Sequence, residues 1–180
     1  MLVSNDSTNN KIKYGLILSY CRHLIPVSNK RFVVGEGPVA FTAAIEPYTV
    51  DHVHANLTIV FDKTITSIGG GYSNLTGVFV APLTGIYLFS CSLLDHAGKH
   101  LQTGQEHGSA MLRGEIVQNG KLLGRIFAHA EVEHRDQGSA TVVSYVTEGE
   151  QVWIRNIDND DLGLGGEFYS LFTGYLLMQL

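Results

Sequence analysis

Histidine side chains are the first candidates for chemistry in this sequence, because imidazole binds metals and exchanges protons near neutral pH. The chain holds eight of them. His52 and His54 are two positions apart, so both imidazoles fall on the same side of a strand, a spacing that can hold a metal ion. A metal-dependent enzyme built on this pair would need a glutamate a few residues later, and residues 55–58 contain none. A solvated loop is therefore the favoured interpretation.

A second set of polar side chains lies in the glycine-rich stretch 95–108, whose sequence is DHAGKHLQTGQEHG. Its composition is typical of an exposed loop between strands, and loops on a rigid scaffold often carry binding residues. The candidate ligand-binding residues in this stretch are Asp95, His96, His100, Gln105 and His107. A plain solvated loop is the alternative interpretation.

Calcium is a third possibility, suggested by acidic and amide side chains near the end of the chain. Asn156, Asp158, Asp160 and Glu167 occupy positions 1, 3, 5 and 12 of an EF-hand-like count. Asp161 stands where the sharp turn of an EF-hand needs glycine, and the flanking segments are strand-like rather than helical. The pattern therefore excludes an EF-hand, although these oxygens could still hold calcium weakly.

The sequence contains no arrangement for nucleophilic catalysis. It has no Gly-x-Ser-x-Gly motif, neither cysteine lies in an activating motif, and the glycine run at 69–71 opens no helix that could bind phosphate. Cys91 falls within a strand-like segment and is expected to be a buried thiol. Cys21 could pair between chains or with nothing. We therefore expect a protein that is not an enzyme.

Charge is unevenly distributed along the 180 residues, which carry a net charge of −5. Residues 1–31 hold five basic groups and one acidic group, and the remaining 149 residues hold 7 basic and 16 acidic groups. This acidic body repels phosphate backbones, which argues against nucleic acid as a partner. Only 16% of the side chains are charged, so neither a coiled coil nor a disordered chain is expected. No stretch reaches the roughly 18 apolar residues that a membrane span needs.

Residues 1–37 differ in character from the rest and are expected to form a polar, basic leader or tail without collagen repeats. An eight-residue apolar run follows Lys11 and Lys13, in the order found in secretory signals. The run is short, starts late and lacks a small-residue cleavage site, so a clear signal peptide is not seen. The turn-forming GEGP at 35–38 marks the expected boundary, and residues 38–180 the expected globular domain.

Short segments rich in β-branched and aromatic residues fill the expected domain, and several alternate with period two, which predicts strands. These segments are 39–45, 56–61, 77–80, 85–94, 110–117, 121–128, 140–146, 151–157 and 168–180. Asn119-Gly120 predicts a hairpin turn, and Glu148-Gly149 a second hairpin. Nine or ten strands imply a β-sandwich, either jelly-roll or immunoglobulin-like. The only tryptophan, Trp153, follows both cysteines, so the jelly roll is preferred.

The segment 61–91 resembles the signature of the complement C1q globular-domain family. The matching residues are Phe61, Tyr72, Phe79, Gly85, Tyr87 and Phe89, whereas Ser67 and Cys91 depart from the pattern. Residues 134–154 and 172–177 resemble later strands of the same family, so the resemblance covers about residues 38–180. It is closest to the stand-alone C1q-domain proteins of invertebrates. The alternating aromatics predict one buried sheet face, and Gly85 and Gly174 are expected where a side chain would crowd a turn or a neighbouring strand.

This resemblance implies an all-β, ten-stranded jelly-roll sandwich of the C1q and tumour necrosis factor type, usually a homotrimer. Some C1q-domain trimers bind calcium near their three-fold axis, and the resemblance carries Asp136, and with it Gln137, over as a calcium site. A turn-capping role at the start of a strand is the alternative for Asp136. The chain shows neither a Gly-X-Y period nor sustained heptads, so any multivalency would come from the trimer itself.

The function expected from these observations is that of a secreted, lectin-like pattern-recognition protein of innate immunity. It would bind microbial glycans such as sialylated or mannose-type sugars, lipopolysaccharide or peptidoglycan. The expected contacts are His134 and Arg135 beside Asp136, the 95–107 loop, and an aromatic face for stacking. Sequons at Asn5, Asn56 and Asn74 fit an extracellular protein. The alternatives are a trimeric structural or signalling protein that binds a protein receptor, and a cupin-like metal enzyme at the His52 pair.

Overall fold

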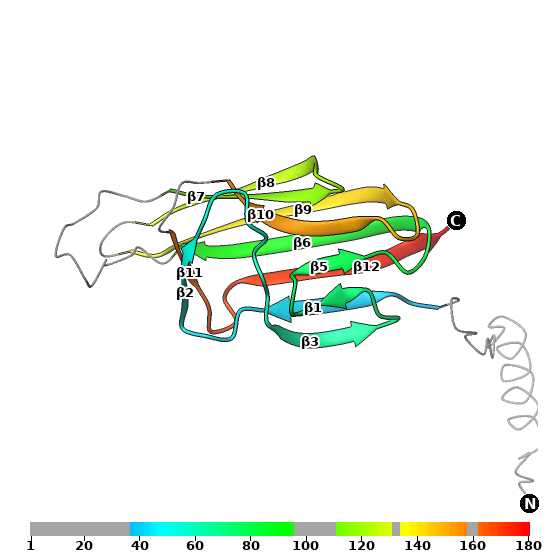
Figure 1. Cartoon of the computed structure of the whole chain (residues 1–180), viewed down its shortest axis with the longest axis horizontal. Helices are drawn as coiled ribbons and strands as arrows, with labels where there is room; N and C mark the ends of the chain where they lie inside the picture. The colour runs from blue at the N-terminus through cyan, green and yellow to red at the C-terminus, as the bar shows by residue number, and fades with distance from the viewer. Residues whose placement is uncertain (1–36, 96–110, 131–133, 158–161) are drawn as a thin grey trace, which may run out of the picture. The chain divides into compact units, whose positions relative to one another are not determined.

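The computed structural model describes residues 37–95, 111–130, 134–157 and 162–180, and in this part of the chain it contains strands but no helix (Figure 1). The strands are β1 (Ala40–Ala44), β2 (Thr49–Val53), β3 (Lys63–Ile68), β4 (Tyr72–Ser73), β5 (Val78–Val80), β6 (Gly85–Asp95), β7 (Met111–Gln118), β8 (Lys121–His129), β9 (Asp136–Val146), β10 (Gln151–Asn156), β11 (Leu162–Gly165) and β12 (Leu171–Gln179). The all-β prediction is therefore confirmed for the described residues.

The strands form two antiparallel sheets. The larger sheet has seven strands in the order β2-β11-β6-β12-β1-β3, and β9 pairs with β6 along its whole length. The smaller sheet has five strands in the order β4-β5-β10-β7-β8. The chain passes between the two sheets several times, for example from β5 to β6, from β6 to β7 and from β9 to β10, and each sheet turns one face inward to a shared core. The jelly-roll prediction is confirmed.

Aromatic side chains fill the space between the two sheets. Strand β6 alternates in burial from Gly85 to Leu93, so that Tyr87 and Phe89 point inward and are fully buried. Phe79 on the opposite sheet meets Phe89 edge to face at 5.5 Å between ring centroids. Phe61 is also fully buried, so the predicted aromatic face is confirmed. Each such ring removes about 150–250 Å² from water, so this cluster contributes strongly to the burial that stabilises the domain.

Gly85 and Gly174 lie where the sequence predicted crowding, because other atoms approach each of them too closely for a side chain. A Cβ on Gly174 would lie 2.5 Å from the Phe41 ring, and one on Gly85 would lie 2.3 Å from the Met178 carbonyl oxygen. Cys91, next to this packing, is a buried free thiol, and burial raises its pKa well above the ordinary range. Burial thus favours the neutral thiol, and the prediction that Cys91 is buried is confirmed.

The two predicted hairpin turns have different outcomes. Asn119 (φ 49°) and Gly120 (φ 83°) both adopt the left-handed conformation and join the paired strands β7 and β8, so the first hairpin is confirmed. Glu148-Gly149 also forms a turn, with Gly149 at φ 85°. This turn joins β9 in the larger sheet to β10 in the smaller one, so the second hairpin prediction is wrong. The dipeptide specifies a reversal of the chain but does not determine which strands pair.

The predicted strand at 56–61 is also wrong as a strand. Within this segment only Thr58 forms a bridge, to Arg155, while the backbone of Ile59 donates to the Ile154 carbonyl at 2.9 Å. The segment crosses toward the smaller sheet and buries Ile59 and Phe61 without joining a ladder. The sequence did not predict strands β2, β3, β4 and β11. They are short or polar, so their alternation is weak.

Residues 1–36 lie outside the described part, so the expected boundary at residue 37 and the role of Cys21 remain predictions. Among the residues that the structure describes, no helix is long and apolar enough to cross a membrane.

Candidate functional site

Arg135 and Tyr48 meet at one end of the larger sheet, where β1 and β6 end and β9 and β12 begin. The Arg135 guanidinium lies 5.3 Å from the centroid of the Tyr48 ring and donates a hydrogen bond to the Tyr48 hydroxyl. Tyr48 is nevertheless 55% exposed. The pair therefore combines a cation, a phenol and an open aromatic face in one place.

The loop that carries Tyr48 is held against the loop between β11 and β12. The backbone of Gly166 donates to the Tyr48 carbonyl at 3.0 Å, and that of Glu167 donates to the Pro47 carbonyl at 3.1 Å. A Cβ on Gly166 would lie only 1.6 Å from the Pro47 carbonyl oxygen. Only glycine permits this approach, so the sequence of one loop sets the position of the other.

Two further aromatic rings are exposed beside this contact, in a turn with an unusual backbone conformation. Glu167 (φ 49°) and Phe168 (φ 66°) are consecutive non-glycine residues in the left-handed region. This conformation is costly for a bulky side chain and is concentrated at functional sites. Phe168 remains 45% exposed and Tyr169 52% exposed, so the strained turn displays the rings instead of burying them.

Gln137 joins these loops to the sheet. Its side-chain amide donates to the Tyr169 carbonyl at 2.7 Å and also to the hydroxyl of Ser92 on β6. We call the exposed group of Tyr48, Arg135, Gln137, Phe168 and Tyr169 the loop-end patch. It contains the expected Arg135 and Gln137, but its three aromatic residues were not predicted.

Asp136 performs the turn-capping role that was considered as the alternative to calcium binding. One carboxylate oxygen accepts from the backbone of His129 at 2.8 Å, and the other accepts from the backbone of Gln137 at 2.9 Å. Among the described residues, no group of three or more His, Cys, Asp or Glu side chains could hold a metal ion. Calcium also takes backbone and amide oxygens, which that grouping does not count, so calcium at Asp136 and Gln137 remains a prediction.

The other expected site residues are spread over several environments. His134 is exposed next to Arg135. Asp95 needs a correction: it ends strand β6 instead of opening an exposed loop, it is only 1% exposed, and its carboxylate accepts from the backbone of Ala130 at 2.9 Å. Burial removes it from direct contact with a surface ligand. Outside the described residues lie His96, His100, Gln105 and His107, so their predicted roles are untested.

The two remaining metal hypotheses, the His52 pair and the acidic cluster at 156–167, are not tested by the described residues. His54 is exposed and lies just beyond β2, while the side chain of His52 is outside the described part. Asn156 is buried, and its amide donates to the Val53 carbonyl, so it acts as a clamp on the β2 end. Asp158 and Asp160 lie outside the described residues.

An ion row crosses the outward face of the smaller sheet and was missed by the sequence analysis. Glu115 on β7 is 5% exposed and accepts hydrogen bonds from Arg155 on β10 and Arg125 on β8, its direct neighbours in the ladders. These bonds, that of Arg155 above all, hold the pKa of Glu115 below its ordinary value. Alternation along the three strands could have predicted that Glu115, Arg125 and Arg155 share one face. It could not have predicted the register that makes them direct neighbours.

The outward face of the larger sheet is apolar at one end and carries hydroxyl groups in the middle. Alternation in β6 and the pairing registers place Tyr175, Leu88 and Val143 in one cross-strand row. Tyr175 is 41% and Val143 59% exposed. The next row consists of Thr66, Thr42, Thr173, Ser90 and Thr141. Within this row, Ser90 and Thr141 share a hydrogen bond of 2.9 Å and Thr42 and Thr173 one of 3.2 Å.

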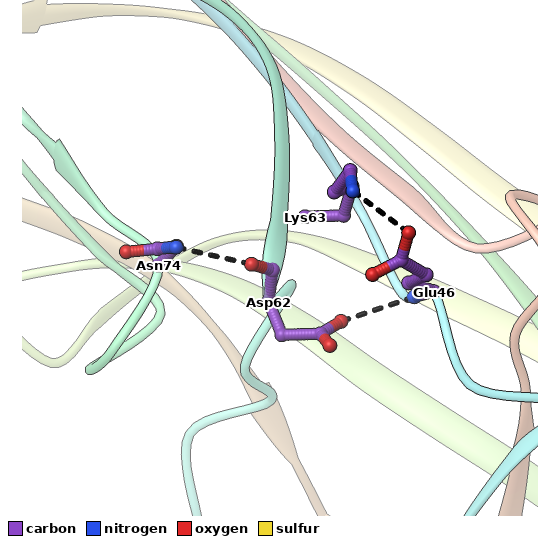
Figure 2. Close-up of polar contacts among 4 residues, drawn as sticks. All are labelled: Glu46, Asp62, Lys63 and Asn74. Carbon is purple, nitrogen blue, oxygen red and sulfur yellow. Dashed lines mark hydrogen bonds and ion pairs between the residues drawn. The ribbon is translucent and has the colours of Figure 1, made fainter.

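A polar cluster anchors the start of the loop that leads to Tyr48 (Figure 2). The Lys63 ammonium donates to the Glu46 carboxylate at 2.8 Å, which raises the pKa of Lys63. The backbone of Glu46 donates to the Asp62 carboxylate at 3.0 Å, and the Asn74 amide donates to the Asp62 carbonyl at 3.1 Å. The cluster ties the end of β1 to β3 and to the β4–β5 turn.

The order and packing of the strands define the class of this protein as a jelly-roll β-sandwich. Three solved structures share that fold: the globular domain of zebrafish complement 1qA protein (TM-score 0.61, 14% identity, 79% of this chain and 99% of that one), murine APRIL (0.59, 11%, 78% and 100%) and the Eiger TNF of S. frugiperda (0.59, 12%, 79% and 94%). At these identities the likeness concerns the fold alone.

The chain belongs to the C1q domain family, whose sequence pattern matches residues 40–177. It is 32% identical over 141 residues to mouse complement C1q tumor necrosis factor-related protein 2, and 33% identical over 141 residues to mouse complement C1q tumor necrosis factor-related protein 7. These alignments cover 77% of this chain but only 42% and 43% of the relatives. The chain thus spans less than half the length of these curated relatives. The family resemblance inferred from the sequence is confirmed.

Proposed function

We propose that this C1q-domain protein is a secreted, non-enzymatic recognition protein that binds microbial surface glycans at the loop-end patch. The observation that carries the proposal is the Arg135 guanidinium held on the exposed ring of Tyr48. A guanidinium recognises a carboxylate through paired hydrogen bonds, and an open aromatic face offers apolar area beside a hydroxyl. This chemistry favours sugars that carry a carboxylate, such as sialylated glycans, over neutral mannose-type sugars.

The same proposal includes a homotrimer, in which the outward face of the larger sheet is the contact between copies. Exposed apolar residues are grouped there in register, and contiguous exposed apolar patches mark interaction surfaces. The membership of the C1q domain family supports a trimer as well. Each copy would add one loop-end patch, and three patches held together raise the avidity for a repetitive glycan surface without a new contact.

A glycan array probed with the purified full chain, with and without EDTA, tests the glycan proposal. We expect binding to carboxylate-bearing glycans, and at least a tenfold loss in Arg135→Ala, the effect of removing about 1.4 kcal/mol. Arg125→Ala is the matched control, because it removes an exposed arginine from the other sheet. The EDTA arm separates calcium-dependent from calcium-independent binding. Absence of glycan binding in both arms, or equal loss in the two variants, would contradict the proposal.

A protein receptor is the second candidate partner, and the outward face of the smaller sheet favours it. Phe127 is 54% exposed next to Arg125 on β8, with Arg155 and the half-buried Trp153 on β10. Aromatic and arginine side chains are enriched at protein interfaces. A pull-down of candidate receptors in the presence of competing glycan distinguishes the two functions. Receptor capture that Arg125→Ala abolishes and glycan does not compete would support the second one.

A further inference from the structure

Two sequons in the described part of the chain lie in exposed turns, and neither is used by the proposed function. They are Asn56-Leu57-Thr58, between β2 and β3, and Asn74-Leu75-Thr76, between β4 and β5. We propose that Asn56 and Asn74 are N-glycosylation sites, each modified by an oligosaccharide on the side-chain amide. The proposal rests on the extracellular placement in the proposed function, because the modification occurs in the secretory pathway.

Asn74 presents its amide at the surface in an orientation that glycosylation can keep. The side chain is exposed, and one amide hydrogen is donated to the Asp62 carbonyl at 3.1 Å (Figure 2). A glycosylated amide loses one of its two hydrogens, so the remaining hydrogen can maintain this bond. The neighbouring Leu75 is 86% exposed, which is unusually open for an apolar residue and would be covered by an attached glycan.

Asn56 is displayed by a different backbone geometry. It lies in the left-handed region at φ 65°, and its backbone donates to the Asn156 carbonyl at 2.7 Å. The backbone is thus fixed by the end of β10, while the side chain is exposed. Asparagine tolerates this conformation better than most residues, so both the sequon and the backbone conformation of the turn favour asparagine at position 56.

The modification is a group transfer whose balance needs one co-reactant, an oligosaccharide linked to a polyisoprenyl pyrophosphate. The amide nitrogen forms a bond to the anomeric carbon of the first sugar, and the bond from that carbon to the pyrophosphate oxygen breaks. The pyrophosphate leaves with the electron pair, and the nitrogen gives up one proton. No oxidant or reductant is required.

The two sites lie in turns that contribute no residue to the loop-end patch or to the apolar row of the larger sheet. Glycans at Asn56 and Asn74 are therefore compatible with both proposed uses of the domain. They would make the ends of these turns hydrophilic, where Leu57 is 51% exposed in addition to Leu75.

Expression of the full chain behind a heterologous signal peptide in a eukaryotic host tests the proposal. Protein from cells and medium is treated with an N-glycan amidase, which leaves aspartate where a glycan was attached, and the peptides are mapped by mass spectrometry. We expect conversion at both residues. Thr58→Ala and Thr76→Ala should each abolish conversion at one site, while Thr58→Ser and Thr76→Ser should retain it.

An unmodified peptide at Asn56 or Asn74 would overturn the proposal for that site. The third sequon, at Asn5, lies outside the described residues and is scored separately by its own peptide. Failure of the glycan-binding proposal is distinguishable, because the array can be probed with the full chain produced in a bacterial host, which does not add these modifications. The result does not depend on the protein's own leader, because the added signal peptide directs the chain into the secretory pathway.

Discussion

The loop-end patch is held together by contacts between residues that are far apart in the sequence. Arg135 directly precedes β9, Tyr48 lies between β1 and β2, and Tyr169 precedes β12. Backbone hydrogen bonds between the two loops, and the side chain of Gln137 between loop and sheet, fix their relative positions. Residues that only support this geometry should therefore affect binding without touching a ligand.

Gly166→Ala tests this supporting role. The added methyl group would meet the Pro47 carbonyl oxygen, so the 45–48 loop has to move, at a cost of about 1–3 kcal/mol. We expect a lower urea midpoint together with weaker glycan binding. Gly124→Ala is the matched control, because its methyl group would meet the Val142 side chain, far from the patch. Equal glycan binding by the two variants would argue against the patch.

Glu115→Gln tests the ion row through its dependence on pH. Because the arginines lower the pKa of Glu115 from 4.5, the ion row stabilises the fold above that pH and the contribution is lost as pH falls through the folded-state pKa. We expect the variant to lose about 1–3 kcal/mol at pH 7, and the difference from wild type to shrink in acid. Urea unfolding of the variant and of the wild type, at pH 7 and in acid below the ordinary pKa of glutamate, measures this difference. Glu148→Gln, in an exposed turn, is the control, and a difference independent of pH would contradict the assignment.

At the scale of elements, the β7–β8 hairpin shows a turn whose sequence and conformation agree. Gly120→Ala places a side chain at φ 83°, where nothing blocks it but the backbone conformation is unfavourable. We expect a loss of about 1–2 kcal/mol in the free energy of unfolding, measured by urea titration. Gly120→Asn should lose less, because asparagine visits this region more readily. Equal stability of the three proteins would mean that the turn does not limit the hairpin.

The elements differ in how well their sequences predict them, for physical reasons. Strand β6 was predicted because a strand with one face on the core alternates in burial, and Tyr87 and Phe89 mark its inward positions. The 56–61 segment has similar composition but crosses between sheets, and composition does not record pairing partners. The patch shows the same limit: the 134–137 segment was identified, whereas Phe168 and Tyr169 join it only through backbone pairing with a distant loop.

At the scale of the whole molecule, the account depends on which sheet face meets another copy of the chain. Val143→Glu places a charge in the apolar row of the larger sheet, and burying an unpaired charge is costly. We expect this variant to keep the β-rich circular dichroism spectrum and to dissociate. Phe127→Glu is the control, because Phe127 is comparably exposed at 54% but lies on the smaller sheet. Dissociation of Phe127→Glu alone would place the contact between copies on the smaller sheet and contradict the proposal.

The mass of the wild-type chain in solution tests the central claim most directly. Light scattering on protein from a bacterial host, over a range of concentrations, should give about 59 kDa, three times the 19.7 kDa of one chain. A mass that stays at 19.7 kDa at every concentration would contradict the assembly and the multivalent binding proposed from it.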